Sequence, residues 1–218
     1  MARGFTHESA YNESKEWYTP RDIFRGLGID FDLDPCSPGN AIVPWIPVQH
    51  HISITDFPDG LASRWKGRVW MNPPYGADTP KWMKKLAQHG NGIALVFART
   101  DTAWFHQYAS KADAVCFIAG RISFIPADKS LLYADGLYAP KGGCGAASML
   151  LGYGVDCASA VMGCGLGLSL PVSRFCETRR VGNPSGVSSR FARACWPDPH
   201  ENSPAITEPG RDFVINNS

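Results

Sequence analysis

The 218-residue sequence is missing several features that would place it quickly in a class of proteins. No apolar run is long enough to cross a bilayer, and residues 1–8 lack the apolar stretch of a signal peptide. The 21 basic and 20 acidic residues give a net charge of +1, so any binding to nucleic acid would have to depend on a local basic patch. These absences predict a cytoplasmic protein and leave its partners open.

The sequence also contains no C-x-x-C pair, although it has seven cysteines. The odd number and the apolar or glycine-rich surroundings of four cysteines favour buried free thiols over disulfides or zinc ligands. These four are Cys36, Cys116, Cys144 and Cys157. His50 and His51 are adjacent, so their side chains point in different directions, and no cluster of carboxylates accompanies them. We therefore predict no metal site.

The domain organisation follows from composition along the chain. With 44% hydrophobic residues, the chain suits one globular domain with a full core. Residues 1–15 are polar and irregular, which predicts a mobile N-terminal arm. Strand-like and helix-like segments alternate over residues 16–170, which predicts an α/β domain with a mainly parallel sheet flanked by helices. Periodicity disappears in residues 171–218, which are predicted to be a disordered tail.

The individual elements can be predicted from apolar runs and from helix signals. The strand-like runs cover residues 31–34, 67–71, 92–98, 114–118 and 147–153, and the last is expected to close the sheet. The helix-like segments cover residues 20–27, 79–88, 102–110 and 155–170. Thr19 is a candidate N-cap of the first helix. No G-x-G-x-x-G stands between a strand and a helix, so the sequence does not indicate a dinucleotide site.

The segment V-W-M-N-P-P-Y-G at residues 69–76 is the strongest candidate for chemistry. An apolar strand stops there at two consecutive prolines, each of which fixes φ and lacks an N–H. Asn72, Pro73 and Pro74 should therefore form a stiff extended segment with main-chain carbonyls that no sheet or helix uses. Asn72 adds a side-chain acceptor and Tyr75 a flat stacking face. This set suits a planar amino group such as N6 of adenine, with an ordinary loop as the alternative.

A second candidate is Asp34, at the end of the predicted strand 31–34. Pro35 and Cys36 follow it and turn the chain. In open α/β sheets, ligands bind at the carboxyl ends of the strands, so a carboxylate there indicates a ligand site. A simple turn role for Asp34 is the competing interpretation.

Together these segments resemble the S-adenosylmethionine (AdoMet)-dependent DNA adenine N6-methyltransferases, most of all the phage-type Dam family. The resemblance covers residues 14–155, and its motifs are specific in combination although each is short. It rests on E-W-Y-T-P at 16–20, F-D-L-D-P-C at 31–36, R-V-W-M-N-P-P-Y at 68–75, A-R-T-D-T and W-F-H within 98–106, and G-R-I-S-F-I at 120–125. It implies a Rossmann-like AdoMet-dependent methyltransferase fold and a phage or prophage origin, with action in the bacterial host cytoplasm as in restriction-modification.

The resemblance also implies roles for individual residues. The catalytic motif would be Asn72, Pro73, Pro74 and Tyr75. The AdoMet-binding residues would be Tyr18, Thr19, Pro20, Asp34, Pro35, Cys36, Asp56 and Phe57. The glycine-rich F-x-G-x-G of related enzymes is missing and the segment before Asn72 is short, so the acid that binds the cofactor ribose is left open between Asp56 and Asp59.

The implied partner is double-stranded DNA with the target adenine flipped out of the helix. Arg99 and Arg121 are candidate DNA contacts, with a role as solvated surface charges as the alternative. Two other functions remain open. The glutamine-N5 methyltransferases that act on release factors use the same N-P-P-Y, although they carry a glycine-rich first motif that this chain lacks. The second open function is that of a catalytically inactive module that binds AdoMet or nucleic acid.

Overall fold

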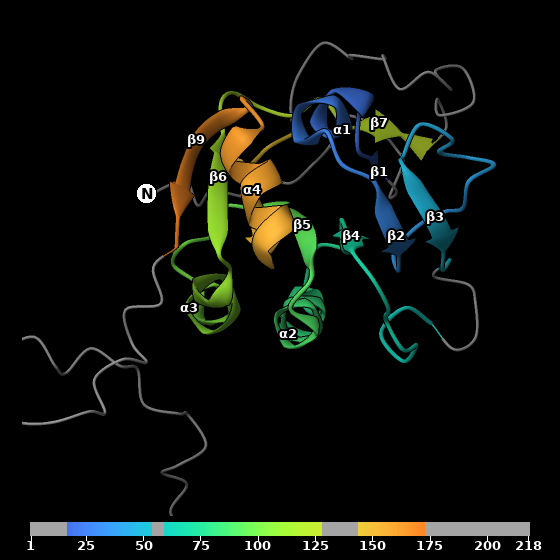
Figure 1. Ribbon diagram of the computed structural model, residues 1–218, viewed down its shortest axis with the longest axis horizontal. Helices are drawn as coiled ribbons and strands as arrows, with labels where there is room; N and C mark the ends of the chain where they lie inside the picture. The colour runs from blue at the N-terminus through green and yellow to red at the C-terminus, as the bar shows by residue number, and fades with distance from the viewer. Residues whose placement is uncertain (1–16, 54–58, 128–143, 173–218) are drawn as a thin grey trace, which may run out of the picture. The chain divides into compact units, whose positions relative to one another are not determined.

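The computed structural model describes residues 17–53, 59–127 and 144–172. In these ranges a seven-stranded sheet has the order β3-β2-β4-β5-β8-β6-β9 (Figure 1). Its strands are β2 (Phe31–Asp34), β3 (Val48–His51), β4 (Val69–Met71), β5 (Gly92–Phe97), β6 (Ala114–Ile118), β8 (Ser148–Tyr153) and β9 (Gly167–Pro171). The helices are α1 (Arg21–Leu27), α2 (Thr79–His89), α3 (Ala103–Tyr108) and α4 (Val155–Gly163), with a 3₁₀ turn η1 (Ala109–Lys111) after α3. A separate antiparallel pair joins β1 (Trp17–Tyr18) to β7 (Ile125–Pro126).

Five strands of the large sheet run in the same direction. β2 pairs in parallel with β3 and with β4, and β4 pairs in parallel with β5. β8 is antiparallel to both β5 and β6, so β6 runs in the direction of β5. The predicted α/β class with a mainly parallel sheet is therefore confirmed. As a consequence, the carboxyl ends of β2, β4, β5 and β6 all lie at one edge of the sheet.

Apolar side chains are buried on both faces of the sheet, which explains the continuous apolar runs of the sequence. In β4, Trp70 joins the core under α1, where its ring lies 4.7 Å from that of Phe24. Its neighbours Val69 and Met71 belong to the core on the opposite face, with Trp82 of α2. Successive residues of a strand point to opposite faces, so this short strand anchors both cores and holds the residues that follow it.

Two sequence predictions about the end of the domain are wrong. The predicted helix 155–170 ends at Gly163, and residues 167–171 form β9, because Gly165 adopts φ +67° and Leu168 and Leu170 alternate around Ser169. The strand 148–153 does not close the sheet, since β8 lies between β5 and β6 and β9 forms the edge. Pro171, assigned to the tail, belongs to this edge strand, where its missing N–H is tolerated.

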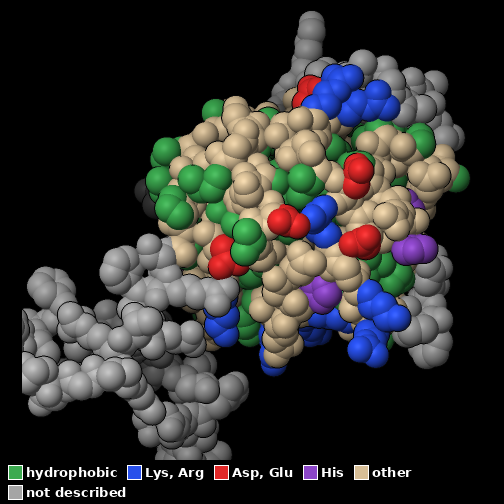
Figure 2. Space-filling model, in the orientation of Figure 1, with side chains coloured by type: hydrophobic (Ala, Val, Ile, Leu, Met, Phe, Trp, Pro, Cys, Tyr) green, Lys and Arg blue, Asp and Glu red, His purple; other side chains and the backbone are tan. Residues whose placement is uncertain are grey.

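Three general features of the sequence can be compared with the structure: its cysteines, its apolar helices and its charged side chains. The described cysteines are free; of the four predicted buried thiols, Cys116 and Cys157 are buried, whereas Cys36 and Cys144 are only partly buried. No helix in the described part of the chain has the length and apolar character needed to cross a membrane. On the face shown in Figure 2, basic side chains lie mainly at the top and along the lower edge, and acidic side chains lie mostly near the middle.

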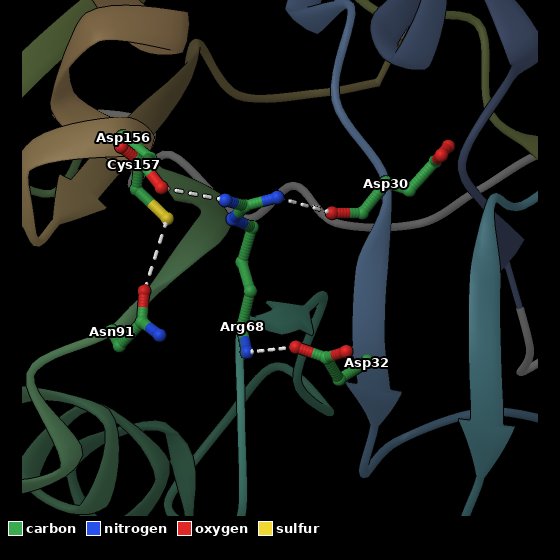
Figure 3. A network of polar contacts seen from close by, with 6 residues as sticks. All are labelled: Asp30, Asp32, Arg68, Asn91, Asp156 and Cys157. Atoms are coloured by element: carbon green, nitrogen blue, oxygen red, sulfur yellow. Dashed lines mark hydrogen bonds and ion pairs between the residues drawn. The ribbon is translucent and has the colours of Figure 1, made fainter.

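Arg68 connects three elements at the amino-terminal edge of the sheet (Figure 3). Its backbone N–H donates to the Asp32 carboxylate at 2.6 Å. Its guanidinium donates to the Asp30 carbonyl at 2.9 Å and to the Asp156 carboxylate of α4 at 2.8 Å. The preceding Gly67 has φ +69°, and a Cβ there would lie 2.1 Å from an Asp32 carboxylate oxygen, so only glycine fits. The network fixes the start of β4 relative to β2 and α4.

We expect Arg68→Met to lower the free energy of unfolding by about 1–2 kcal/mol, because it removes two hydrogen bonds. The Asp156 side chain is 72% exposed, so the ion pair itself contributes little and most of the loss comes from the bond to the Asp30 carbonyl. Urea unfolding is the measurement, with the exposed Lys66→Met as the control. Equal unfolding midpoints for the two variants would contradict a structural role for this network.

Candidate active site

The predicted site residues gather at the carboxyl edge of the sheet. Asp34 ends β2, and Asn72 follows β4 directly. In the sheet, β3 lies beside β2 on the side away from β4, whereas β5 lies beside β4 on the side away from β2. The gap between β2 and β4 is therefore the point at which the strand order reverses, where open α/β sheets bind their ligands. Asp34 and Asn72 stand on its two sides.

The N-P-P-Y motif is held at both of its ends. Met71 before it is fully buried in β4, and Pro73 is buried as well. At the other end, the Thr79 hydroxyl at the start of α2 donates to the Pro74 carbonyl at 3.3 Å and accepts from the Gly76 N–H at 3.1 Å. Among the hydrogen bonds of the described residues, none uses the Pro73 carbonyl. The predicted stiff segment with an unused carbonyl is what the structure contains.

The Asn72 side chain has partners for both ends of its amide. Its Nδ2 donates to Thr19 Oγ1 at 3.4 Å, and its Oδ1 accepts from the Tyr75 hydroxyl at 3.0 Å. An amide oxygen has two lone pairs, so Oδ1 keeps one for a further donor. Asn72 is only partly buried.

Tyr75 stacks on Phe97, a residue that the sequence analysis did not select. The two ring centroids are 4.0 Å apart and the rings are nearly parallel, at 13°. Phe97 is the last residue of β5, so it reaches the carboxyl edge one strand away from Asn72. Tyr75 is 37% exposed. The position of Phe97 near the end of a predicted strand was the sequence signal that could have identified it.

Asp34 is a buried carboxylate without a cationic partner among the described residues. It is 4% exposed, and burial raises its pKa to about 7, only partly offset by a hydrogen bond from the Cys36 N–H at 3.0 Å. Burial and the nearby Asp34 also raise the pKa of the Cys36 thiol, which makes it a poor nucleophile. The bond from the Cys36 N–H, two residues on, is the bond of a turn, so the turn interpretation of Asp34 stands beside a functional one, which its burial at a ligand-binding edge favours.

The loop that contains Gly60 and Leu61 packs against the end of β2. A Cβ on Gly60 would lie 1.9 Å from the Pro35 carbonyl oxygen, so the two backbones are in direct contact. Lys85 of α2 holds this loop by donating to the carbonyls of Gly60 and Leu61. Asp59 accepts from the Ala62 N–H at 2.8 Å and so serves a local turn.

Asp56 and Phe57 lie outside the described residues. The candidates at the N-terminal end of the domain are fixed by the β1–β7 pair and by Trp45. Tyr18 pairs with Ile125, and the Trp45 indole N–H donates to the Thr19 carbonyl at 2.9 Å. The interpretation of Thr19 as an N-cap is wrong, because Pro20 occupies the N-cap position and no side chain caps α1. Thr19 is instead 1% exposed and directs its hydroxyl to Asn72.

The two candidate DNA-binding arginines lie at the same edge as Asn72. Arg99 is the second residue after β5 and Arg121 the third after β6, and both are exposed. Because β4, β5 and β6 run in the same direction, both arginines follow the carboxyl ends of strands. The structure therefore brings them to the edge that carries the N-P-P-Y motif.

Comparisons with known proteins agree with this geometry. The family model described as DNA N-6-adenine-methyltransferase (Dam) matches residues 7–139, more than half of the chain. A DNA N-6-adenine-methyltransferase of Haemophilus phage HP1 (strain HP1c1) is 28% identical over 123 residues, which cover 50% of this chain and 65% of that relative. This chain thus matches just under two thirds of the relative's length. No solved structure gives a significant match.

Proposed function

The chain belongs to the DNA N-6-adenine-methyltransferase (Dam) family, and from this premise we propose that it transfers a methyl group from AdoMet to N6 of adenine in DNA. The observation that carries the proposal is the pair of acceptors after β4. Asn72 Oδ1 keeps a lone pair, and the neighbouring Pro73 carbonyl is unused within the described residues. An exocyclic amine has two N–H donors, and this pair offers one acceptor to each.

The chemistry of the β2 end fits AdoMet, which is cationic at its sulfonium and its amino group. Asp34 is buried there with no cationic side chain beside it in the described ranges, so a positive ligand would stabilise its charged form. Pro35 and Cys36, together with Tyr18, Thr19 and Pro20, would complete the pocket, and Asp56 and Phe57 remain candidates for the adenine end. When bound, AdoMet supplies an electrophilic methyl carbon.

The protein's own contribution is to hold the target nitrogen in a reactive geometry. The lone pair of adenine N6 is delocalised into the ring, which makes it a weak nucleophile. Hydrogen bonds from N6–H to Asn72 Oδ1 and to the Pro73 carbonyl favour a more tetrahedral nitrogen and direct its lone pair toward the methyl group. Direct in-line transfer would break the sulfur–methyl bond as the N6–methyl bond forms, with S-adenosylhomocysteine as the leaving group and the surplus N6 proton passing to solvent. Positioning of this kind lowers a barrier by about 7 kcal/mol or more.

Access to N6 requires base flipping, because N6 is paired inside a duplex. The ring of Tyr75, supported from behind by Phe97, offers a stacking face for the flipped base. Stacking on an aromatic side chain returns about 1–3 kcal/mol of the cost of unstacking. Pro74, which is exposed beside Tyr75, completes the surface against which the base would rest.

The phage relative and the free cysteines support action in a bacterial host cytoplasm.

Arg99 and Arg121 are proposed to contact DNA phosphates. We expect Arg99→Ala or Arg121→Ala to weaken DNA binding and to lower the slope of log affinity against log salt by about 1 for each lost contact. Fluorescence anisotropy over a salt series measures both quantities. Lys111→Ala, at the opposite edge of the sheet before β6, is the control and should change neither. An unchanged slope for both arginine variants would exclude them as phosphate contacts.

The proposed substrate is tested by offering labelled AdoMet with either unmethylated duplex DNA or a glutamine-containing release-factor peptide. We expect label in DNA only. Label in the peptide would favour the glutamine-N5 methyltransferases, which share the N-P-P-Y motif. AdoMet binding without transfer to either substrate would indicate an inactive binding module.

A further inference from the structure

The hydroxyl of Thr19 is buried next to the proposed catalytic amide. Thr19 is 1% exposed, and its backbone is fixed by the Trp45 indole bond to its carbonyl and by the neighbouring β1–β7 pair. Pro20 after it restricts the backbone further. Its Oγ1 therefore stands at a fixed position, 3.4 Å from Asn72 Nδ2.

The second contact of Asn72 makes the arrangement a two-point clamp. Thr19 Oγ1 accepts from Nδ2, and the Tyr75 hydroxyl donates to Oδ1 from within the same motif. An amide held at only one end can turn about its last side-chain bond, whereas an amide held at both ends has its plane fixed. The plane determines where the remaining Oδ1 lone pair points.

The direction of this amide matters for the proposed chemistry. If the amide turned by half a rotation, its NH₂ group would face the NH₂ group of adenine, and two donors would oppose each other. With Nδ2 bonded to Thr19, the oxygen stays on the side of the incoming base. Preorganised groups of this kind act without reorganising during the reaction.

We propose that Thr19 is a positioning residue that fixes the Asn72 amide for the target amine. This inference rests on the proposed function and adds a role for Thr19 through Asn72, separate from contact with AdoMet. A purely structural role is a poor explanation of the hydroxyl, because α1 begins at Arg21 with Pro20 as its N-cap and no side-chain cap, and so does not depend on Thr19 Oγ1. Removing the hydroxyl should leave the fold intact.

The test compares Thr19→Val, which keeps the shape and removes the hydroxyl, with Thr19→Ser, which keeps the hydroxyl. At saturating AdoMet, we expect the single-turnover rate of methyl transfer to fall about five- to tenfold in Thr19→Val, the loss of one neutral hydrogen bond. Thr19→Ser should stay within about twofold of the wild type, since the same bond can form. The KM for DNA should stay unchanged in both variants, and the unfolding midpoint of Thr19→Val should fall by no more than the loss of one neutral hydrogen bond accounts for.

A second readout does not depend on methylation. The side-chain NH₂ signals of Asn72, identified by their absence in Asn72→Asp, should shift and exchange faster with water in Thr19→Val than in the wild type or in Thr19→Ser. This comparison decides the clamp even if the protein transfers no methyl to DNA, in which case the proposed function fails separately.

Several results would overturn the inference. Unchanged Asn72 signals in Thr19→Val would show that the hydroxyl does not hold the amide. A full transfer rate at saturating AdoMet with weakened AdoMet binding would make Thr19 a cofactor contact only. An equal loss of rate in Thr19→Ser and Thr19→Val would attribute the effect to the lost methyl group or to packing.

Discussion

Replacing Asn72 with alanine is expected to lower the rate of methyl transfer by about 10²–10³-fold or more, the loss seen when an enzyme loses one preorganised polar group. The reason is local, since alanine removes the Oδ1 acceptor and leaves the Pro73 carbonyl as the remaining partner of the target amine. Asn72 follows β4 but contributes nothing to its ladder, whose last residue is Met71. We therefore expect the fold and AdoMet binding to be retained.

The control for this variant is Asn91→Ala, at the opposite edge of the sheet. Asn91 precedes β5, and within the described part of the chain its side chain accepts one weak bond, from the Cys157 thiol at 3.7 Å. Its backbone carbonyl, which accepts from Val69, is unaffected by the change. Single-turnover transfer and calorimetric AdoMet binding should distinguish the two variants. Full activity in Asn72→Ala would reject the proposed mechanism.

Replacing Asp34 with asparagine is expected to stabilise the protein at neutral and alkaline pH. Burial raises the pKa of this carboxyl from 3.8 to about 7, so ionisation is easier in the unfolded chain than in the folded one. The contribution of Asp34 to stability is then fully present below about pH 4 and is lost as the pH rises through about 7. At pH 8 the penalty approaches about 4 kcal/mol, an upper value at 1.36 kcal/mol per pKa unit.

Urea unfolding between pH 4.5 and pH 8 measures this effect. The wild type should lose stability over that range, and Asp34→Asn should lose much less. Asp30→Asn is the matched control, because Asp30 stands just before the start of the same strand with an exposed side chain. If Asp34→Asn followed the wild-type curve, the carboxyl would not be the source of the pH dependence.

Asp34→Asn also tests whether Asp34 takes part in binding AdoMet. A buried carboxylate that destabilises the fold at neutral pH suggests a ligand that offsets the cost. We expect Asp34→Asn to bind AdoMet more weakly than the wild type, and wild-type affinity to rise between pH 6 and pH 8 as Asp34 ionises. Isothermal titration calorimetry gives both results. Equal affinity in the two proteins would remove Asp34 from the proposed cofactor site.

Local sequence signals predicted the central part of the fold correctly. β4 and β5 are short apolar runs, and apolar residues alternate with acids in β2; each of the three strands was predicted within two residues of its observed bounds. α2 has both an apolar face and Gly90, in the left-handed conformation, at its end. The N-P-P-Y segment could be interpreted because proline restricts the backbone whatever the tertiary contacts.

The features that the sequence did not predict depend on contacts between distant segments. Nothing local indicates that β8 inserts between β5 and β6, because an apolar run fits a central strand of either direction. The role of Thr19 was also hidden, since T-P before a helix is a common capping signal and its contact with Asn72 spans 53 positions. Phe97 looked like an ordinary core residue until its position at the end of β5 placed it behind Tyr75.

The identity of the methylated nucleoside tests the central claim most directly. Unmethylated duplex DNA is incubated with labelled AdoMet and the protein, digested to nucleosides, and separated by chromatography. We expect the label in N6-methyladenine, and we expect Asn72→Ala to reduce it in line with its slower transfer. Label in methylated cytosine, or no label in DNA from a protein that binds AdoMet, would contradict the assignment of adenine N6 as the target of the Asn72 site.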